Sequence, residues 1–283
     1  MRKFTDFYRE HRGELDALIF DVDGTLTSGG RLISEAAVFI ELLRRDKFPF
    51  FLLTNDSCNS CERKAELICK TGISITPQQI ISAGNSLEMY IQSHGLAGHK
   101  FYQCGSLGEP GYAEKAGMIV THDPHDTDDC EGVVMGEGNY ERRRELEGMF
   151  NFLLKHPDAP VLVANPDSYW PHPHGMGVGA GGMCRFICGL VQEAGFTVTP
   201  TYLGKPYQPI YDLVMKRMPE MIPECKNPVP ERIAMIGDSL ASDIQGANGA
   251  GMLSCLVLTG ITSRVLAESA PLHRKPAEIF DSL

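Results

Sequence analysis

The 283-residue chain lacks any hydrophobic run that approaches the ~18 consecutive apolar residues of a membrane-spanning helix. It also lacks low-complexity tracts and any evident internal repeat. The first ten residues mix charged and aromatic side chains, without the apolar core or the small-residue cleavage site of a secretory signal. These absences predict a protein that is not inserted in a membrane, with a cytoplasmic location by default.

Positive charge is scarce, because 26 Lys and Arg stand against 36 Asp and Glu, for a formal net charge of −10. A chain with this charge repels the phosphates of nucleic acids and of anionic membranes at long range. We therefore expect neither a nucleic-acid partner nor a membrane partner. An anionic substrate would need positive charge placed locally at its binding site.

The nine cysteines do not indicate a disulfide framework, since the number is odd and the chain is long. Such a pattern is typical of reduced thiols in a reducing compartment. Cys58 and Cys61 form a Cys-X-X-Cys pair, but no second pair exists to complete a tetrathiolate zinc site. A reversible thiol switch at the start of a helix stays open for this pair.

Strand-like and helix-like segments alternate along the chain. The expected strands are 17–20, 49–53, 100–104, 132–135, 160–164, 201–203, 232–236 and 253–258. The expected helices are 34–45, 60–70, 76–94, 140–156, 182–194, 209–218 and 242–250. This alternation predicts an α/β protein with a three-layer, doubly wound parallel sheet of the Rossmann type. We expect residues 1–82 and 201–283 to form this core and residues 83–200 to form an inserted, smaller α/β cap domain.

Two carboxylates directly follow the apolar run 17–20, in the sequence Asp21-Val22-Asp23-Gly24-Thr25. Ligands of open α/β sheets collect just beyond the carboxyl ends of such buried strands. The same residues also favour turns, so a simple turn is the alternative interpretation. The other strand ends must decide between the two.

Polar side chains of particular types follow three more expected strands. They are Thr54 and Asn55, Lys205, and Asp238 with Asp243 five residues further on. Each could instead cap a helix or lie in solvent. Together they bring a hydroxyl, an amide, an ammonium group and carboxylates to several strand ends, which is how active sites are commonly assembled.

These four segments, in this order, resemble the four motifs of the haloacid dehalogenase superfamily of phosphotransferases over nearly the whole chain. The long gap between Asn55 and Lys205 is similar to that of members with a C2-type cap between the second and third motifs. Residues 164–167, 203–206 and 258–263 further resemble class IIA, the group of NagD-like and nitrophenylphosphatase-like proteins. The glycine-rich stretch 175–182 departs from the usual pattern of that class.

The resemblance implies a magnesium-dependent phosphatase that hydrolyses a small phosphorylated metabolite through an aspartyl-phosphate. Asp21 would be the nucleophile, and Asp23 would act as general acid and then as general base. Asp21 and Asp238 would bind Mg²⁺ with the main-chain carbonyl of Asp23, and Asp243 would contribute directly or through water.

The resemblance also implies phosphate binding by Thr54, Asn55 and Lys205, which can donate hydrogen bonds or positive charge to a phosphoryl group. Two alternatives stay open: a catalytically silent phosphate-binding or regulatory module, and a phosphotransferase that uses the same aspartyl-phosphate. A homodimer is possible, because dimers formed through the cap occur among proteins that this chain resembles.

Two segments of the expected cap carry polar residues whose role the sequence leaves open. Asn165, Asp167, Trp170 and His172, with His174, are candidates for substrate selection, or else form a proline-stiffened surface loop. Residues 122–129 hold enough Asp and His to imitate a metal site. A solvated acidic loop is the expected structure there.

Overall fold

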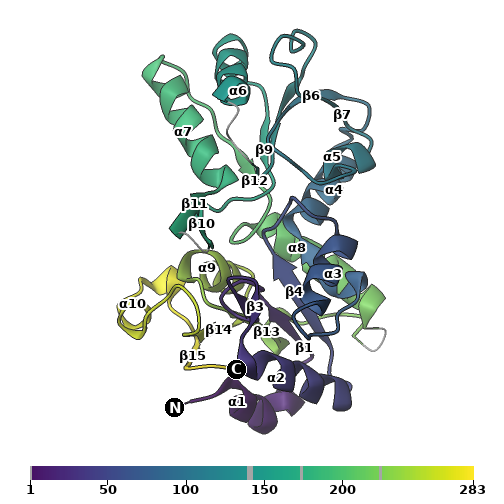
Figure 1. Cartoon of the computed structure of the whole chain (residues 1–283), viewed down its shortest axis with the longest axis vertical. Helices are drawn as coiled ribbons and strands as arrows, with labels where there is room; N and C mark the ends of the chain where they lie inside the picture. Colours follow the sequence, from purple (N-terminus) through teal and green to yellow (C-terminus); the bar gives the residue numbers. More distant parts are fainter. Residues whose placement is uncertain (1, 139–142, 173–174, 223–224) are drawn as a thin grey trace. The chain divides into compact units, whose positions relative to one another are not determined.

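The computed structural model describes residues 2–138, 143–172, 175–222 and 225–283 (Figure 1). The chain divides into two compact units. The first consists of Met1–Thr54, Cys61–Ile81 and Tyr211–Leu283, and the second of Asn55–Ser60 and Ser82–Ile210.

The first unit is built on a six-stranded sheet in the order β15-β14-β13-β1-β4-β5. Its strands are β1 (Ala17–Phe20), β4 (Phe50–Thr54), β5 (Ile80–Ser82), β13 (Ile233–Gly237), β14 (Leu253–Val257) and β15 (Glu278–Phe280). The central strand β1 pairs in parallel with both β13 and β4, and β13, β14 and β15 continue in parallel. The four residues of β1 are apolar and buried, as a central strand covered on both faces requires.

Helices cover both faces of this sheet. They are α1 (Phe4–His11), α2 (Ser34–Arg45), α3 (Cys61–Cys69), α8 (Gln208–Met221), α9 (Gln245–Gly249) and α10 (Arg264–Glu268). Leu18 and Phe20 of β1 pack on one face with side chains of α1, α2 and α3. On the opposite face Leu256 of β14 packs with Ile244, just before α9, and with Ala267 of α10. A short antiparallel pair, β2 (Thr27–Ser28) and β3 (Arg31–Leu32), follows β1. The expected three-layer, doubly wound fold is confirmed.

The second unit has its own five-stranded parallel sheet, in the order β12-β9-β8-β6-β7. Its strands are β6 (Lys100–Cys104), β7 (Ile119–Thr121), β8 (Gly132–Met135), β9 (Val161–Val163) and β12 (Thr201–Tyr202). An antiparallel hairpin, β10 (Tyr169–His172) and β11 (Gly175–Val178), lies between β9 and the next helix in the chain.

This second sheet is also covered on both faces. Its helices are α4 (Ala83–Ser93), α5 (Tyr112–Lys115), α6 (Arg143–Lys155) and α7 (Ala180–Glu193). Phe152 of α6 and Ile187 of α7 pack over Tyr102 and Val133, and the two helices lie side by side (Figure 1). On the other face, Leu87 of α4 and Ala113 of α5 belong to a separate apolar cluster with further residues of the strands. The second unit is therefore an α/β sandwich with its own core.

The prediction of a single helix over residues 76–94 is wrong. Residues Pro77–Gln79 form one 3₁₀ turn, Ile80–Ser82 form the buried strand β5, and only then does α4 begin. Ser82 caps α4, because its side chain accepts a hydrogen bond from the Asn85 amide while the Asn85 side chain accepts one from Ser82. The proline turn imitates a helix start, but two adjacent isoleucines are better buried at the edge of the sheet than placed on a helix.

The strand at residue 201 also differs from expectation, because β12 pairs with β9 in the second sheet and not with a strand of the first. Helix α7 crosses over between β9 and β12, so the chain returns in parallel beside the strand it has just left. A pattern of apolar residues identifies such a strand but does not say which sheet it joins.

Most other predicted elements are present with small shifts at their ends, the least predictable feature of any element. Residues 140–142 of the expected helix 140–156 lie outside the described residues, and α6 spans the rest except for the last residue. Within the described residues, no helix is both long and apolar enough to cross a membrane.

Candidate active site

Three carboxylates converge at the carboxyl edge of the first sheet. Ligand oxygens of Asp21, Asp238 and Asp243 all lie within 4.8 Å of one another. Asp21 directly follows β1 and Asp238 directly follows β13, and these two strands are neighbours paired in parallel. The exposed fractions of Asp238 and Asp243 are only 3% and 1%. Buried carboxylates at this density need a counter-charge, and oxygen ligands of this kind suit a hard divalent cation.

Glycines enclose the Asp238 carboxylate. A Cβ at Gly24 or at Gly260 would overlap Asp238 Oδ2, so both positions must be glycine for the carboxylate to lie there. Gly24 also has a φ of +87°, in the left-handed region that favours glycine. The Ile261 N–H donates to Asp238 Oδ2 at 2.7 Å, and Thr259 Oγ1 donates to the Gly24 carbonyl at 2.6 Å. The segment after β14 therefore holds Asp238 in place.

Asp243 reaches the trio from a single π-helical turn, Leu240–Ile244, which precedes α9. Its Oδ2 accepts a hydrogen bond from the Ser239 N–H at 3.1 Å, and its own N–H donates to the Ser239 carbonyl at 3.0 Å. A Cβ at Gly237 would overlap the Asp243 carboxylate. The wider turn and the missing side chain at Gly237 together bring Asp243 against the end of β13.

Asp23 lies in the tight turn after β1, and its side chain is exposed. The turn is closed by the N–H groups of Leu26 and Thr27, which both donate to the Val22 carbonyl at 2.9 Å. Thr27 Oγ1 lies 3.3 Å from Asp23 Oδ1 and donates to it. The Asp23 carboxylate is not one of the three converging side chains and is exposed.

Thr54 ends β4, the other neighbour of β1. In the pairing register Phe20 lies opposite Leu52, so Thr54 lies one residue further along its strand than Asp21. Its exposed fraction is 7%. The ends of β4, β1 and β13 thus bring a hydroxyl and carboxylates to one edge of the sheet, as the sequence predicts.

Asn55 and Lys205 meet in the second unit. The Asn55 amide nitrogen donates to the Lys205 carbonyl at 3.0 Å, and the Lys205 N–H donates to Asn55 Oδ1 at 2.8 Å. The same Asn55 nitrogen donates to Asp167 Oδ1 at 3.0 Å. One side-chain amide therefore fixes the backbone of Lys205, whose exposed fraction is 2%.

Asn165 continues this series of hydrogen bonds to a residue that the sequence analysis missed. Asn165 Oδ1 accepts from the Asp167 N–H at 2.9 Å, and Asn165 Nδ2 donates to Glu137 Oε2 at 2.7 Å. Burial raises the pKa of Glu137, although hydrogen bonds from Ala180, Asn165 and Trp170 oppose the shift. Glu137 belongs to no recognisable motif, and only its place after β8 could have drawn attention to it.

Trp170 lies on the hairpin strand β10, opposite Gly177, and its exposed fraction is 43%. A Cβ at Gly177 would lie 2.7 Å from the indole ring, so the glycine makes room for the ring. Part of the glycine-rich stretch noted in the sequence thus serves the packing of Trp170. The side chain of His172 and the whole of His174 lie outside what the structure describes.

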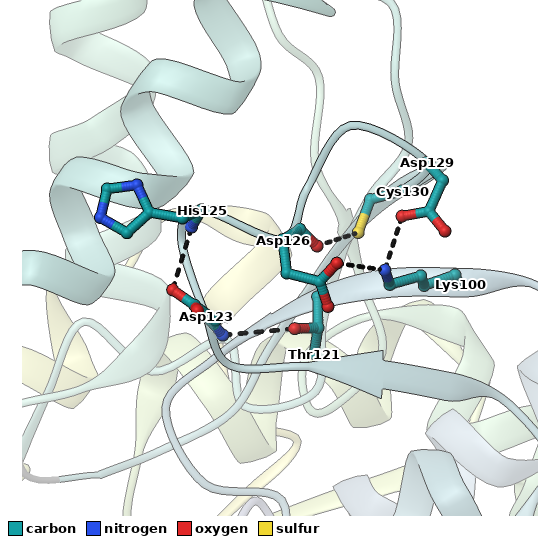
Figure 2. Close-up of polar contacts among 7 residues, drawn as sticks. All are labelled: Lys100, Thr121, Asp123, His125, Asp126, Asp129 and Cys130. Atoms are coloured by element: carbon teal, nitrogen blue, oxygen red, sulfur yellow. Dashed lines mark hydrogen bonds and ion pairs between the residues drawn. The ribbon is translucent and has the colours of Figure 1, made fainter.

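The acidic segment 122–129 is organised by a lysine (Figure 2). Lys100 Nζ lies 2.8 Å from Asp126 Oδ1 and 2.5 Å from Asp129 Oδ1. These hydrogen bonds raise the pKa of Lys100, and the Lys100 hydrogen bond lowers the pKa of Asp126. Asp123 Oδ1 accepts from the His125 N–H at 3.1 Å and lies 3.4 Å from Arg144 Nη2. Among the described residues, the Asp21 trio is the only group of three side chains that could hold a metal ion. The acidic residues of segment 122–129 are exposed, as expected for a solvated loop.

All nine cysteines are thiols. Cys61 opens α3, and its Sγ donates to the Ile80 carbonyl at 3.7 Å. The Cys58 N–H donates to Asp56 Oδ1 at 2.7 Å. A redox role for the pair stays a prediction.

Two family models match the chain. One, described as haloacid dehalogenase-like hydrolase, matches residues 18–119, and another of the same kind matches residues 202–283. Together they cover more than half of the chain and include Asp21, Thr54, Lys205 and Asp238.

Similarities to individual proteins agree with the matches to the family models. The chain is 26% identical over 266 residues to a dihydroxyacetone phosphatase of Corynebacterium glutamicum, covering 93% of this chain and 87% of the relative. The structure matches NagD of Escherichia coli K-12 with a TM-score of 0.78 and 23% identity, over 95% of this chain and 96% of NagD. It matches a glycerol phosphate phosphatase of Mycobacterium tuberculosis, in complex with magnesium, with a TM-score of 0.80 and 23% identity, over 95% and 75% of the two chains. The chain therefore belongs to the haloacid dehalogenase-like hydrolases and is a phosphoric monoester hydrolase.

Proposed function

We propose that this protein is a magnesium-dependent phosphatase that hydrolyses a small phosphorylated metabolite through an aspartyl-phosphate. The observation that carries the proposal is the convergence of Asp21, Asp238 and Asp243 within 4.8 Å at the carboxyl edge of the sheet. The names of two relatives, a dihydroxyacetone phosphatase and a glycerol phosphate phosphatase, support a small phosphorylated substrate.

The residues present fit a divalent cation. Asp21, Asp238 and Asp243 offer hard oxygen ligands, two of them buried, and Gly24 and Gly260 leave the space in which the Asp238 carboxylate lies. We propose that the main-chain carbonyl of Asp23 completes the protein ligands. When bound, Mg²⁺ would neutralise the negative charge of the phosphate ester and so allow an anionic nucleophile to approach.

We propose that a carboxylate oxygen of Asp21 attacks the phosphorus, while the bond from phosphorus to the ester oxygen breaks. Asp23 donates its proton to the departing alkoxide, so the alcohol leaves neutral. A water molecule then attacks the phosphorus of the aspartyl-phosphate and gives a proton to Asp23, while the bond from phosphorus to the Asp21 oxygen breaks. Inorganic phosphate leaves, and both carboxylates return to their starting states.

Thr54, Asn55 and Lys205 are the proposed phosphate-binding residues. Thr54 supplies a hydroxyl beside Asp21 at the strand edge, and Lys205 supplies a positive charge that hydrogen-bonds phosphoryl oxygens. Asn55 already uses its side-chain amide to hold the Lys205 backbone. Its contribution is therefore to orient the Lys205 segment.

We propose that the first unit is the catalytic core and that the second is the inserted cap. The expected limits were 1–82 and 201–283 for the core and 83–200 for the cap, and the two units differ from them mainly at Asn55–Ser60 and at residues 201–210, which belong to the second unit. Trp170, which is partly exposed, and His172 would contact the leaving group, while Asn165 and Asp167 shape the segment that leads to them. A cytoplasmic location agrees with nine thiols. A homodimer remains part of the proposal.

Hydrolysis of p-nitrophenyl phosphate with added Mg²⁺ tests this function. We expect wild-type turnover, and a loss of at least about 10³-fold in Asp21→Asn, because the neutral amide cannot attack phosphorus. Asp158→Asn, an exposed position in the second unit, is the matched control and should keep full activity. Unchanged turnover in Asp21→Asn would remove the proposed nucleophile.

The same assay separates hydrolase from phosphotransferase. A hydrolase releases one inorganic phosphate for each p-nitrophenol, whether or not an alcohol is added. Less phosphate than nitrophenol in the presence of an acceptor alcohol would favour a phosphotransferase. No turnover at all, with Mg²⁺ bound, would favour the silent module.

A further inference from the structure

Glu137 is an acidic residue that the proposed chemistry does not use, yet burial raises its pKa. An ionised carboxylate in such a place costs free energy unless hydrogen bonds compensate it. Glu137 Oε2 accepts two of them, from Asn165 Nδ2 at 2.7 Å and from the Ala180 N–H at 3.2 Å. A neutral side chain of the same length, such as Gln, would avoid this desolvation cost. The hydrogen bonds that Glu137 makes therefore indicate its role.

The backbone of Glu137 is fixed on its other side. Its carbonyl accepts from the Ser106 N–H at 2.5 Å, in an antiparallel bridge between the segments that follow β6 and β8. The side chain therefore extends from an anchored backbone toward the end of β9. Ala180 begins the 14-residue helix α7, whose first N–H groups favour a carboxylate.

From Glu137 a continuous series of hydrogen bonds leads to Lys205. Asn165 donates to Glu137 and accepts from the Asp167 N–H, and Asp167 accepts from Asn55. Asn55 then holds both the N–H and the carbonyl of Lys205. The series connects the carboxyl ends of β8, β9 and β12, which are neighbours in one sheet.

We propose that Glu137 is a positioning residue of the phosphatase: it orients Asn165, and through Asp167 and Asn55 it holds the Lys205 segment in the conformation that binds phosphate. This inference rests on the proposed function, because it takes Lys205 as a phosphate ligand. Hydrogen bonding with the Trp170 side chain also acts on Glu137, in the direction that lowers its pKa.

A double-mutant cycle tests whether Glu137 acts through Lys205. With Mg²⁺ and p-nitrophenyl phosphate, we expect Glu137→Ala to lower kcat/KM by roughly 10²-fold, as small displacements of positioned groups do. In a Lys205→Ala background the same substitution should cost little more, because the group it positions is gone. If the loss of kcat/KM in the double variant equals the product of the two single losses, the proposal is overturned and Glu137 has a merely structural role.

Two further variants separate charge from geometry. Glu137→Gln keeps a side-chain oxygen that can accept from Asn165 and Ala180, so it should recover most of the lost activity. Glu131→Ala removes an exposed glutamate just before β8 and should match the wild type. A Gln variant as impaired as the Ala variant would contradict positioning by hydrogen bonds.

Hydrogen exchange gives a readout that does not depend on activity. The Lys205 amide, bonded to Asn55 Oδ1, should exchange at least about tenfold faster in Glu137→Ala than in the wild type, because its acceptor is less well held. Unchanged exchange would overturn the positioning proposal whatever the enzyme does. A wild-type protein without phosphatase activity would instead count against the proposed function.

Discussion

Two groups of acidic side chains, one in each unit, look alike in the sequence and differ in the structure. Asp21, Asp238 and Asp243 come from separate parts of the first unit, and their oxygens converge in a place where two of the three are buried. The acidic residues of segment 122–129 are close in sequence, but Asp126 and Asp129 are exposed and bind Lys100 (Figure 2).

The difference teaches that local density of acidic residues is a poor sign of a metal site. Neighbouring residues on a loop can turn toward solvent and find a nearby lysine, which satisfies them at little cost. The carboxylates of Asp238 and Asp243 come from the end of β13 and from the turn before α9, and hydrogen bonds from the Ile261 and Ser239 N–H groups hold them where they lie. Convergence enforced by tertiary structure is what favours a bound cation.

The largest expected effect that separates the two groups is on Mg²⁺ binding. Wild-type protein at a Mg²⁺ concentration of about 100 times Kd should be stabilised by about 2.7 kcal/mol, and Asp238→Asn should lose nearly all of this. Asp126→Asn is the matched control and should keep it. Thermal unfolding with and without MgCl₂ measures both, and the comparison fails if the Asp126 variant is the one that loses stabilisation.

A smaller effect, on the free energy of unfolding, is expected for substitution of the glycines that enclose Asp238. Gly260→Ala places a methyl group against Asp238 Oδ2 and should destabilise the protein by about 1–3 kcal/mol, as overpacking does. Gly249→Ala, at the end of α9, meets nothing within 4 Å and should be neutral or gain up to about 1 kcal/mol. Chemical denaturation of the two variants is the measurement, and equal stabilities would show that the space around Asp238 is not constrained.

The smallest effect concerns the acidic loop. Lys100→Met should raise hydrogen exchange across residues 122–130 at neutral pH, with Mg²⁺ binding and activity unchanged. Loss of Mg²⁺ binding in this variant would mean that the two acidic groups are not independent.

The pH dependence of the loop follows from the two pKa shifts. The raised pKa of Lys100 means that its ion pairs stabilise the folded loop. This stabilisation is complete below the usual lysine pKa of 10.5 and is lost as pH rises through the pKa of Lys100 in the folded protein. The lowered pKa of Asp126 likewise means that its ion pair stabilises the folded loop. This stabilisation is complete above the usual aspartate pKa of 3.8 and is lost as pH falls through the pKa of Asp126 in the folded protein. The hydrogen-exchange protection factors of residues 122–130 should therefore be constant between pH 3.8 and pH 10.5, and should decrease at lower and at higher pH.

Much of the fold could be predicted because buried parallel strands are short apolar runs with polar residues at their ends. The runs before Asp21, Thr54 and Asp238 identify β1, β4 and β13 without knowledge of their order. The order itself, with β1 between the other two, depends on which strands pair. The strand β12 shows the limit, since two residues of strand pattern do not specify which sheet they join.

The polar networks were harder to predict than the strands. Asn55 was predicted to bind phosphate, and the structure shows its side chain holding the Lys205 backbone. Glu137 carries no motif, and the part played by Gly260 follows only from where Asp238 lies. Hydrogen bonds between residues far apart in sequence depend on the folded backbone, which local patterns do not describe.

By itself, the sequence determined the α/β class and the carboxylates at the strand ends, because apolar periodicity and the residue that ends each strand are local properties. Only the tertiary structure decided that Asp21, Asp238 and Asp243 converge, while Asp126 and Asp129 pair with Lys100. It also decided that Glu137 lies at one end of a series of hydrogen bonds to Lys205. The physical reason is the same in each case: such groups meet only after the strands have paired and the chain has fixed which side chains are buried together.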